Sequence, residues 1–179
     1  MQTVTDIDFT ILNFLHEKLS CGFLDMLMPI VTFLGNAGLI WIAASLALLF
    51  VKRHRKTALM LLGGLACSAV VGNLILKNLV ARARPFALNP AVNLLISAPT
   101  DYSFPTGHTM SSFAAAVILY HADKRLGIPA LILAFLIAFS RLYLYVHFPS
   151  DVVAGAVIGA VIGYAVCKIG GRISRLRTK

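Results

Sequence analysis

Charged side chains are scarce in this sequence. Only 13% of its 179 residues are Asp, Glu, Lys or Arg, whereas 59% are hydrophobic and the mean hydropathy is +0.84. So few polar side chains cannot cover the surface of a water-soluble globule, and so many apolar ones exclude an intrinsically disordered chain. The composition therefore predicts an integral membrane protein.

Cysteine is sparse as well, and a targeting segment is missing. The three cysteines, Cys21, Cys67 and Cys167, lie in apolar stretches without C-x-x-C spacing, which excludes a disulfide scaffold. We expect them to be small buried hydrophobic residues. The first twenty residues carry three acidic side chains and no small-residue cleavage site, so no secretory signal is expected. The membrane spans themselves would then direct insertion.

Long apolar runs predict the fold class. A transmembrane helix needs about 20 mainly apolar residues. Six runs approach this length, at 22–35, 38–51, 57–80, 109–122, 128–146 and 152–169. The first is shorter than the others and contains Asp25 and Pro29. The sequence therefore predicts a single all-α domain over residues 1–179, a polytopic membrane protein built as a six-transmembrane-helix bundle.

The segment before the first run predicts an N-terminal amphipathic helix. Apolar side chains recur there at helical spacing, opposite a polar face. The apolar ones are Ile7, Ile11, Phe14, Leu15 and Leu19, and the polar ones are Asp8, His16, Glu17 and Lys18. Such a helix lies in the membrane interface or packs on the first span, and the pattern leaves both possibilities open.

Basic residues predict the orientation of the bundle. The chain has 16 Lys and Arg against 7 Asp and Glu, a formal net charge of +9. Short cytoplasmic loops concentrate basic residues, and the loop 52–56 carries four of them. Alternation of the later spans then brings Lys124, Arg125 and the basic tail 168–179 to the same side. Topology thus accounts for most of the positive charge, and no nucleic-acid partner is expected.

Four cations remain near the opposite, extracytoplasmic face: Lys77, Arg82, Arg84 and Arg141. Cations at span ends away from the cytoplasm are costly unless they are paired or solvated, so we expect a function for the set. Fixed cations around one space favour a multiply charged anion, and phosphate matches the guanidinium fork. Arg82 taken alone is equally well explained as an anchor that snorkels to the headgroups.

A second segment on this side, 104–108, predicts a phosphate-binding helix start. Thr106 stands where a helix N-cap belongs, just before the apolar run at 109–122. Gly107 lets an anion approach the free N–H groups of the first turn, and His108 is then held beside that anion. Taken alone, the motif is more typical of a cap that only starts a helix.

A third segment pairs a histidine with a carboxylate. Arg141 lies six residues before His147, and Asp151 lies four residues after it, with Pro149 breaking the helix between them. The break lets the chain turn back into the membrane, so that Asp151 accepts a hydrogen bond from one imidazole nitrogen. The other nitrogen is then an unprotonated nucleophile. A His–Asp pair that only caps a helix is the alternative.

Two other kinds of site are disfavoured. Only Asp101 and Asp151 could join the two histidines as metal ligands, and the nearby cations would repel a divalent ion, so no metal is expected. The serines near His108 (Ser103, Ser111 and Ser112) are not part of a nucleophile elbow, which disfavours a serine hydrolase.

The three segments together resemble the motifs of the type 2 phosphatidic acid phosphatase superfamily, membrane lipid phosphatases that share an active-site pattern with the vanadium haloperoxidases. Lys77, six residues and then Arg84-Pro85 is similar to the first motif. Pro105-Thr106-Gly107-His108 is similar to the second motif. Ser140-Arg141, five residues, His147, three residues and Asp151 is similar to the third motif. The resemblance by motif covers residues 77–151.

The resemblance implies a role for each matching residue. His147 would attack phosphorus and form a phosphohistidine, Asp151 would orient it, and His108 would protonate the leaving oxygen and then activate water. The other matching groups would stabilise the five-coordinate transition state: Lys77, Arg84, Arg141 and the amides of Thr106 and Gly107. No metal or organic cofactor is implied.

Two positions stand apart from the family pattern. The family usually has Ser where this chain has Thr106, which keeps the hydroxyl but adds a methyl group expected to crowd the site. Arg82 lies outside the three motifs, so its substitution by Ala is expected to have a mild effect.

The position of the motifs at span ends predicts an amphiphilic substrate, because a lipid phosphate lies at that depth without leaving the bilayer. The expected partners are therefore a lipid phosphate or diphosphate and the bilayer, and no obligate protein partner is evident. On the extracytoplasmic side of a bacterial cytoplasmic membrane the best candidate is undecaprenyl diphosphate, hydrolysed to undecaprenyl phosphate. Phosphatidylglycerophosphate and phosphatidic acid, made on the other leaflet, are the alternatives. The segment 86–100 is expected either to roof the site or to be an ordinary connecting loop.

Two functions of other classes stay open. A lipid or anion transporter would use the same cations to bind and move a phosphate, although no internal repeat is visible. A haloperoxidase-like oxidoreductase with bound vanadate would share the site residues but would gain nothing from six spans.

Overall fold

A computed structural model describes residues 2–176, and side chains within residues 3–171. Every regular element in this range is a helix, as the composition and apolar runs predict. In chain order they are α1 (Gln2–Leu19), α2 (Gly22–Leu34), η1 (Asn36–Gly38), α3 (Leu39–Phe50), η2 (Lys52–His54), α4 (Arg55–Ser68), η3 (Ala69–Leu76), α5 (Lys77–Val80), α6 (Pro85–Leu88), α7 (Gly107–Ala122), α8 (Lys124–Tyr143) and α9 (Pro149–Leu176).

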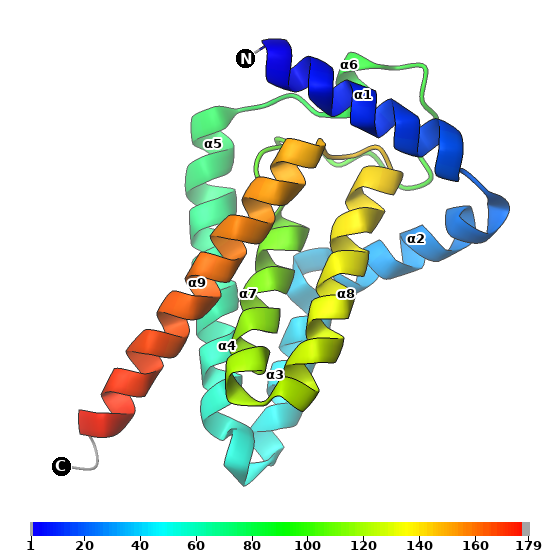
Figure 1. Cartoon of the computed structure of the whole chain (residues 1–179). Coiled ribbons are helices and arrows are strands. Elements are labelled where there is room, and N and C mark those ends of the chain that lie inside the picture. The colour runs from blue at the N-terminus through cyan, green and yellow to red at the C-terminus, as the bar shows by residue number, and fades with distance from the viewer. Residues whose placement is uncertain (1, 177–179) are drawn as a thin grey trace.

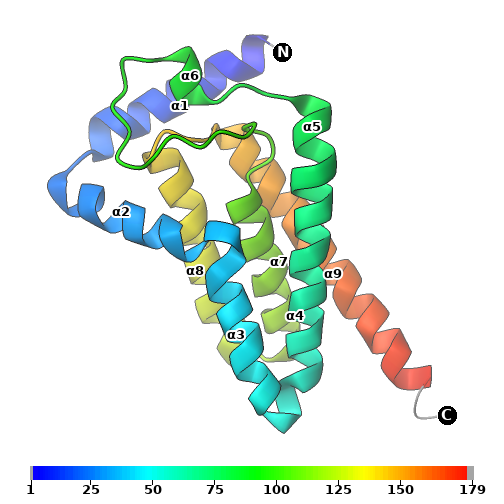
Figure 2. The same cartoon turned by 180° about the vertical axis from the view of Figure 1, so that it is seen from behind.

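The structure does not confirm the expected number of six membrane-crossing helices. Within the described residues, three helical stretches are long and apolar enough to cross a bilayer: Lys52–Leu88, Lys124–Tyr143 and Pro149–Gly171. The pair Gly22–Leu34 and Asn36–Phe50 adds a fourth if the two helices, bent by 47° at their junction, form one broken span. Helix α2 has 13 residues, short of the about 20 that a span needs. It runs across one end of the bundle, whereas α3 runs along it (Figure 2). The count of six spans is therefore not confirmed.

The run at 57–80 forms one continuous rod. Helix α4 passes without a break into the π-helical segment η3 and then into α5, so the rod extends from residue 55 to residue 80. A π-helical turn holds an extra residue, changes the direction of the side chains that follow and is frequent at functional sites. Asn73 in η3 and Lys77, the first residue of α5, both line the same cavity near the end of this rod.

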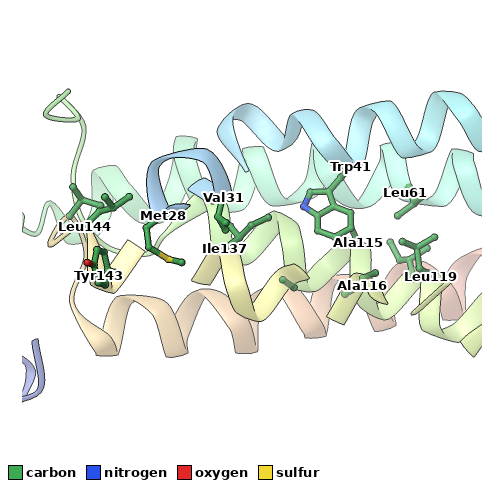
Figure 3. Close-up of a cluster of buried hydrophobic side chains, with 14 of the residues drawn as sticks. Met28, Val31, Trp41, Leu61, Ala115, Ala116, Leu119, Ile137, Tyr143 and Leu144 are labelled. Atoms are coloured by element: carbon green, nitrogen blue, oxygen red, sulfur yellow. The ribbon is translucent and has the colours of Figure 1, made fainter. Parts of the chain in front are cut away.

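Helix α7 is the central helix, packed against α4, α8 and α9 (Figure 1). Its buried side chains join a hydrophobic core with Met28 and Val31 of α2, Leu61 of α4 and Ile137 of α8 (Figure 3). The indole N–H of Trp41 in α3 donates a hydrogen bond to Oγ of Ser112 in this core at 2.9 Å. The only tryptophan of the chain thus ties α3 to the central helix.

Helices α7 and α9 approach closely because α9 has glycine at every fourth position of one face. A Cβ atom added at Gly155, Gly159 or Gly163 would lie 2.9, 2.2 or 2.6 Å from the carbonyl oxygens of Thr106, Met110 and Ala114. Small residues at this spacing allow two backbones to pack in contact inside a membrane, where burial of apolar surface does not itself drive helix association.

The opposite face of α9 is apolar and exposed. Val153, Val157 and Val161 are 58 to 63% exposed. Apolar side chains on the outer surface of a helix suit a bundle that is surrounded by lipid.

One expectation about the cysteines is wrong for two of the three. Cys167 is buried, but Cys21 and Cys67 are exposed, because an apolar stretch on the outside of such a bundle need not be covered by protein.

The helix expected before the first run is present as α1, which lies across one end of the bundle (Figure 1). Its packing face differs from the apolar face of the sequence pattern. Asp8 and Leu12 are buried against the bundle, whereas Ile7, Ile11 and Phe14 are 42 to 59% exposed. The polar Asp8 faces inward because it meets a cation there.

Two groups of cations lie at opposite ends of the bundle. The basic loop 52–56 and the turn before Lys124 lie at one end, and the ends of α5 and α8 lie at the other, together with α1 (Figure 1). The side chains of the basic tail beyond Gly171 lie outside the described residues. Within the described part, the four cations singled out above are thus separated from the basic loops by the length of the bundle.

Candidate active site

A cavity of about 850 Å³ opens between the second half of α2, the junction of η3 and α5, the start of α7 and the end of α8. Its wall includes the three cations of the motifs, both motif histidines and Gly107. The lining members of the predicted set are Lys77, Arg84, Gly107, His108, Arg141 and His147. Thr106 and Asp151 are fully buried just behind this wall. The tertiary structure therefore brings together the three segments that the motif spacing singled out.

Arg84 is held by backbone carbonyl groups at the entry to α6. Its Nε donates to the carbonyl of Asp101 at 2.7 Å, and its Nη1 donates to the carbonyl of Val146 at 2.7 Å. The same Nη1 lies 3.1 Å from Nε2 of His147. Arg84 is only 5% exposed, so this planar group is fixed in place beside the imidazole before any ligand binds.

Asp101 is a member of the site that the motif analysis did not include. Its carboxylate accepts hydrogen bonds from Nη2 of Arg84 at 2.6 Å and from Nζ of Lys77. Burial raises the pKa of Asp101, but the hydrogen bond from Lys77 and the charges of both cations outweigh it and hold that pKa at about 2. The Asp101 side chain is 50% exposed. The Asp101 carboxylate is thus paired with two of the three cations, at a position that a phosphate group could also reach.

Arg141 is the third cation, in the last turn of α8. Its Nη1 donates to Oγ1 of Thr32 in α2 at 2.7 Å. Its Nε is buried and has no hydrogen-bond partner among the described residues. A buried guanidinium with an unpaired N–H is costly by itself and is suited to an incoming anion.

At the start of α7, Thr106 occupies the predicted N-cap position, with Gly107 and His108 in the first turn, but its hydroxyl makes no capping hydrogen bond. The Thr106 N–H is directed at the carbonyl of Asp151 at 3.4 Å, so this amide already has an acceptor. The Thr106 methyl points toward α9: a Cβ added at Gly155 would lie 3.1 Å from it. The extra methyl therefore packs between helices instead of crowding the cavity.

His108 has a partner that the sequence did not reveal. Its Nε2 lies 2.8 Å from Oδ1 of Asn36 in the turn between α2 and α3. With Nε2 as the donor, the other ring nitrogen, Nδ1, is free to exchange a proton with a ligand. Asn36 is therefore suited to select the tautomer of His108.

His147 and Asp151 do not form the direct hydrogen bond that their spacing predicts. Nδ1 of His147 lies 3.7 Å from Oδ2 of Asp151. That oxygen instead accepts a 2.5 Å hydrogen bond from Ser103 Oγ and a 3.0 Å hydrogen bond from the Phe148 N–H. Ser103 Oγ also lies 3.4 Å from His147 Nδ1, so the serine hydroxyl stands between the two groups.

The surroundings of His147 keep its imidazole neutral. Burial, followed by the charges of Arg141 and Arg84, holds the pKa of His147 well below its ordinary value. Its Nε2 is the nitrogen beside Arg84 and the cation cluster. A neutral imidazole with one nitrogen toward bound anions has the electronic state that a nucleophile requires.

Arg82, which lies outside the three motifs, forms hydrogen bonds with two carboxylates behind the active site. Its Nη1 donates to Oδ1 of Asp151 at 2.6 Å and its Nη2 donates to Oδ2 of Asp8 at 2.7 Å. The alternative of an anchor that snorkels to the headgroups is therefore wrong, because the guanidinium is paired within the protein. The expectation of a mild effect for Arg82→Ala rests on the motif pattern alone, and these contacts instead predict a larger effect.

The arrangement can bind and polarise a phosphate. Two guanidinium groups and an ammonium group converge on one cavity, a helix begins at its wall, and two imidazoles face it. Among the described residues no group of three or more His, Cys, Asp and Glu side chains is placed to hold a metal ion.

Comparison with known proteins agrees with this fold and site. The sequence profile of the PAP2 superfamily matches residues 57–175, and the chain belongs to this family. The "Undecaprenyl-diphosphatase" of Sulfolobus acidocaldarius is 36% identical over 131 residues, which are 73% of this chain and 63% of the relative, less than two thirds of its length. The "Bacitracin transport permease protein BcrC" of Bacillus licheniformis is 35% identical over 138 residues, 76% of this chain and 68% of the relative.

A solved structure shares the fold. The crystal structure of a transmembrane PAP2-type phosphatidylglycerolphosphate phosphatase from Bacillus subtilis superimposes with a TM-score of 0.80. The alignment covers 97% of this chain and 89% of that chain, with 24% sequence identity. At this identity the likeness establishes the helical architecture alone.

Proposed function

We propose that this protein is a membrane lipid phosphatase that hydrolyses a phosphomonoester or a diphosphate of a lipid through a phosphohistidine intermediate. The observation that carries the proposal is the convergence of three cations and two imidazoles, from segments far apart in the sequence, on one cavity. Phosphoryl transfer depends on positioning and on neutralisation of the charge on the phosphoryl oxygens. Lys77, Arg84 and Arg141 supply that neutralisation in this proposal, without a metal or an organic cofactor.

In the first step, Nε2 of His147 forms a bond to phosphorus while the bond between phosphorus and the lipid oxygen breaks. His108 gives a proton to the departing oxygen. Arg84, 3.1 Å from the attacking nitrogen, is close enough to bind an equatorial phosphoryl oxygen as the new bond forms.

In the second step, water attacks the phosphorus of the phosphohistidine. His108 accepts a proton from that water, the bond between phosphorus and Nε2 breaks, and inorganic phosphate is released. The Asn36 contact supports both steps, because it leaves one nitrogen of His108 for the proton that moves.

The cavity wall supports a lipid as the substrate. Besides the cations, the cavity is lined by apolar side chains, among them Phe33, Leu65, Leu95 and Ile96. The last two belong to the segment 86–100. This segment therefore forms part of the cavity wall, which supports the expectation that it roofs the site. When the phosphate of a lipid binds the cations, the apolar chain of the same lipid would therefore lie against these apolar side chains. Undecaprenyl diphosphate is the best candidate, and phosphatidylglycerophosphate and phosphatidic acid are the alternatives.

We further propose that the site faces the extracytoplasmic side of a bacterial cytoplasmic membrane. The support is the separation of the loop 52–56 from the site by the length of the bundle (Figure 1), because basic loops stay in the cytoplasm. A variant whose native cysteines are replaced by serine, with one cysteine introduced in the loop, tests this orientation in intact cells with a membrane-impermeant reagent. Labelling without lysis would contradict it.

A phosphate-release assay tests the activity. The purified protein in detergent, with EDTA present, is expected to release inorganic phosphate from at least one member of a panel that holds undecaprenyl diphosphate, phosphatidylglycerophosphate and phosphatidic acid. Loss of release with EDTA and recovery with Mg²⁺ would contradict the metal-independent mechanism. The rank order of kcat/KM across the panel identifies the preferred lipid.

A lipid or anion transporter is the second candidate, because the Bacillus licheniformis relative is named a transport permease protein. Transporters usually bind substrate near the bilayer midplane, whereas Lys77, His108 and Arg141 of this cavity lie near helix ends at one end of the bundle. Folded protein that binds a lipid phosphate but releases no phosphate from any member of the panel would favour the transporter.

A further inference from the structure

An acidic residue of the N-terminal helix is buried at the back of the active site. Asp8 of α1 is 2% exposed. Its Oδ2 accepts a hydrogen bond from Arg82 at 2.7 Å, and its Oδ1 accepts one from the N–H of Ser150 at 2.9 Å. The profile of the family begins at residue 57, so α1 lies outside the matched region. An element beyond the motifs thus contributes a carboxylate to the support of the site.

Arg82 connects this carboxylate with Asp151. Its Nη1 donates to Oδ1 of Asp151 at 2.6 Å and to Oγ of Ser150 at 2.8 Å. The guanidinium also lies 4.0 Å from the ring centre of Phe148. With two carboxylates at its edge and an aromatic ring at its face, Arg82 has little freedom to move.

The structure assigns Asp8 and Arg82 a positioning role: the pair holds Asp151, and through Asp151 and Ser103 it holds the imidazole of His147 in line for phosphoryl transfer. This inference rests on the proposed function. The geometry supports it because His147 has no direct hydrogen bond to Asp151, the distance being 3.7 Å. The imidazole is therefore oriented by a carboxylate that must itself be fixed, and Arg82 holds one of its oxygens while Ser103 holds the other.

The charges give Asp8 a second effect. Asp151 and Arg82 alone would be a neutral pair, whereas two carboxylates around one guanidinium keep one net negative charge behind His147. The imidazole becomes positive as it bonds to phosphorus, and a buried negative charge behind it stabilises that form, as the carboxylate of a catalytic triad stabilises an imidazolium. Removal of Asp8 would leave the neutral pair and weaken this stabilisation without touching the cavity.

The test compares variants of α1 and Arg82 by kcat, KM and unfolding temperature, with farnesyl diphosphate as a short-chain probe and the best lipid of the panel as a second substrate. Asp8→Asn is expected to lower kcat roughly 10- to 100-fold, the scale of a small misplacement of a reacting group, with KM changed less than about threefold. Arg82→Gln is expected to lose at least as much, and Arg82→Lys to recover part of the loss, because it keeps the cation.

Two matched controls separate positioning from simple attachment of the helix. Phe9→Ala removes the edge-to-face contact of α1 with Phe148, whose ring centroids are 5.1 Å apart, without changing the charges. It is expected to lower the unfolding temperature with kcat close to wild type. Asp6→Asn changes an exposed acid on the same helix and is expected to change neither quantity.

The outcomes are distinct. Equal losses of kcat in Asp8→Asn and Phe9→Ala, or a higher KM with an unchanged kcat in Asp8→Asn, would overturn the positioning role and leave α1 as an attachment only. If Asp8→Asn does not fold, the Arg82 variants carry the test, and an unchanged kcat in a folded Arg82→Gln overturns the role. A wild-type protein that releases no phosphate from any lipid overturns the proposed function and this inference together, whereas an active wild type with a fully active Asp8→Asn overturns the inference alone.

Discussion

The middle of the bundle and its active-site end are held together by different forces. In the middle, α7 and α9 meet through glycines and backbone, and the core is apolar. At the active-site end, the start of α9 is joined to α1 and to the segment 77–104 by ion pairs and hydrogen bonds among charged and polar groups. A substitution in the middle should therefore change stability, whereas one at the active-site end should change chemistry.

His147→Ala breaks the active-site end most severely. The variant lacks the nitrogen that bonds to phosphorus, so turnover is expected to fall to background while the unfolding temperature stays near that of the wild type. Phosphate release and trapping of radiolabelled phosphoenzyme at alkaline pH measure this. Retained activity would show that another group is the nucleophile.

His108→Ala is expected to slow turnover by about 10²- to 10⁴-fold, the usual value of a general acid and base. Part of the loss should be recovered with a lipid diphosphate, whose leaving group needs less protonation than an alcohol. Asn36→Ala is the matched variant. It leaves the imidazole in place and removes its partner, so its loss should be smaller, and a larger loss than that of His108→Ala would contradict the assignment.

Gly159→Val tests the middle of the bundle. Its Cβ would lie 2.2 Å from the carbonyl oxygen of Met110, so the helices must separate, at a cost of about 3 kcal/mol or more in the free energy of unfolding. Residual activity per folded molecule should stay within a few-fold of wild type. Val157→Leu, on the exposed face of α9, is the control and should unfold at the wild-type temperature, as measured by thermal denaturation in detergent.

Asp101→Asn sharpens the comparison at the cations. The carboxylate pairs with both Lys77 and Arg84 and offsets one of their two charges when no ligand is bound. Its removal should therefore make inorganic phosphate a stronger competitive inhibitor, with an inhibition constant lower by about tenfold, or roughly 1.4 kcal/mol. Asp123→Asn, at the N-cap of α8, is the control. An unchanged or higher inhibition constant would show that Asp101 does not compete with phosphate.

The smallest expected effect concerns the titration of His147. Because its pKa is lowered well below the ordinary value, the imidazole should stay neutral as the pH falls from 8 through 6.5, and should gain a proton only in more acidic solution. Carbon-13 spectra of labelled histidine, with the His147 signal assigned by its absence in His147→Ala, measure this in the substrate-free protein. A midpoint at or above pH 6.5 would contradict the burial and the cation contacts described here.

The sequence was sufficient to predict the fold class and the residues that occur at the fixed spacing of the three motifs. The apolar runs predicted an all-helical membrane protein, and the spacing of Lys77, Arg84, Thr106, Gly107, His108, Arg141, His147 and Asp151 predicted the family and the candidate site. It was not sufficient for α2, whose apolar composition resembles that of a span although the helix runs across the end of the bundle (Figure 2). Hydropathy measures whether a segment tolerates lipid, and it does not report the direction of the helix.

The tertiary structure alone decided how the charges are paired. Asp8 and Arg82 are 74 positions apart, and Lys77 and Asp101 are 24 apart. Neither pair has a periodicity or motif that marks it, because an ion pair depends only on where two folded segments meet. The same is true of Ser103 between His147 and Asp151 and of Asn36 beside His108. Local sequence determines which side chains are available, whereas packing of distant helices determines which of them touch.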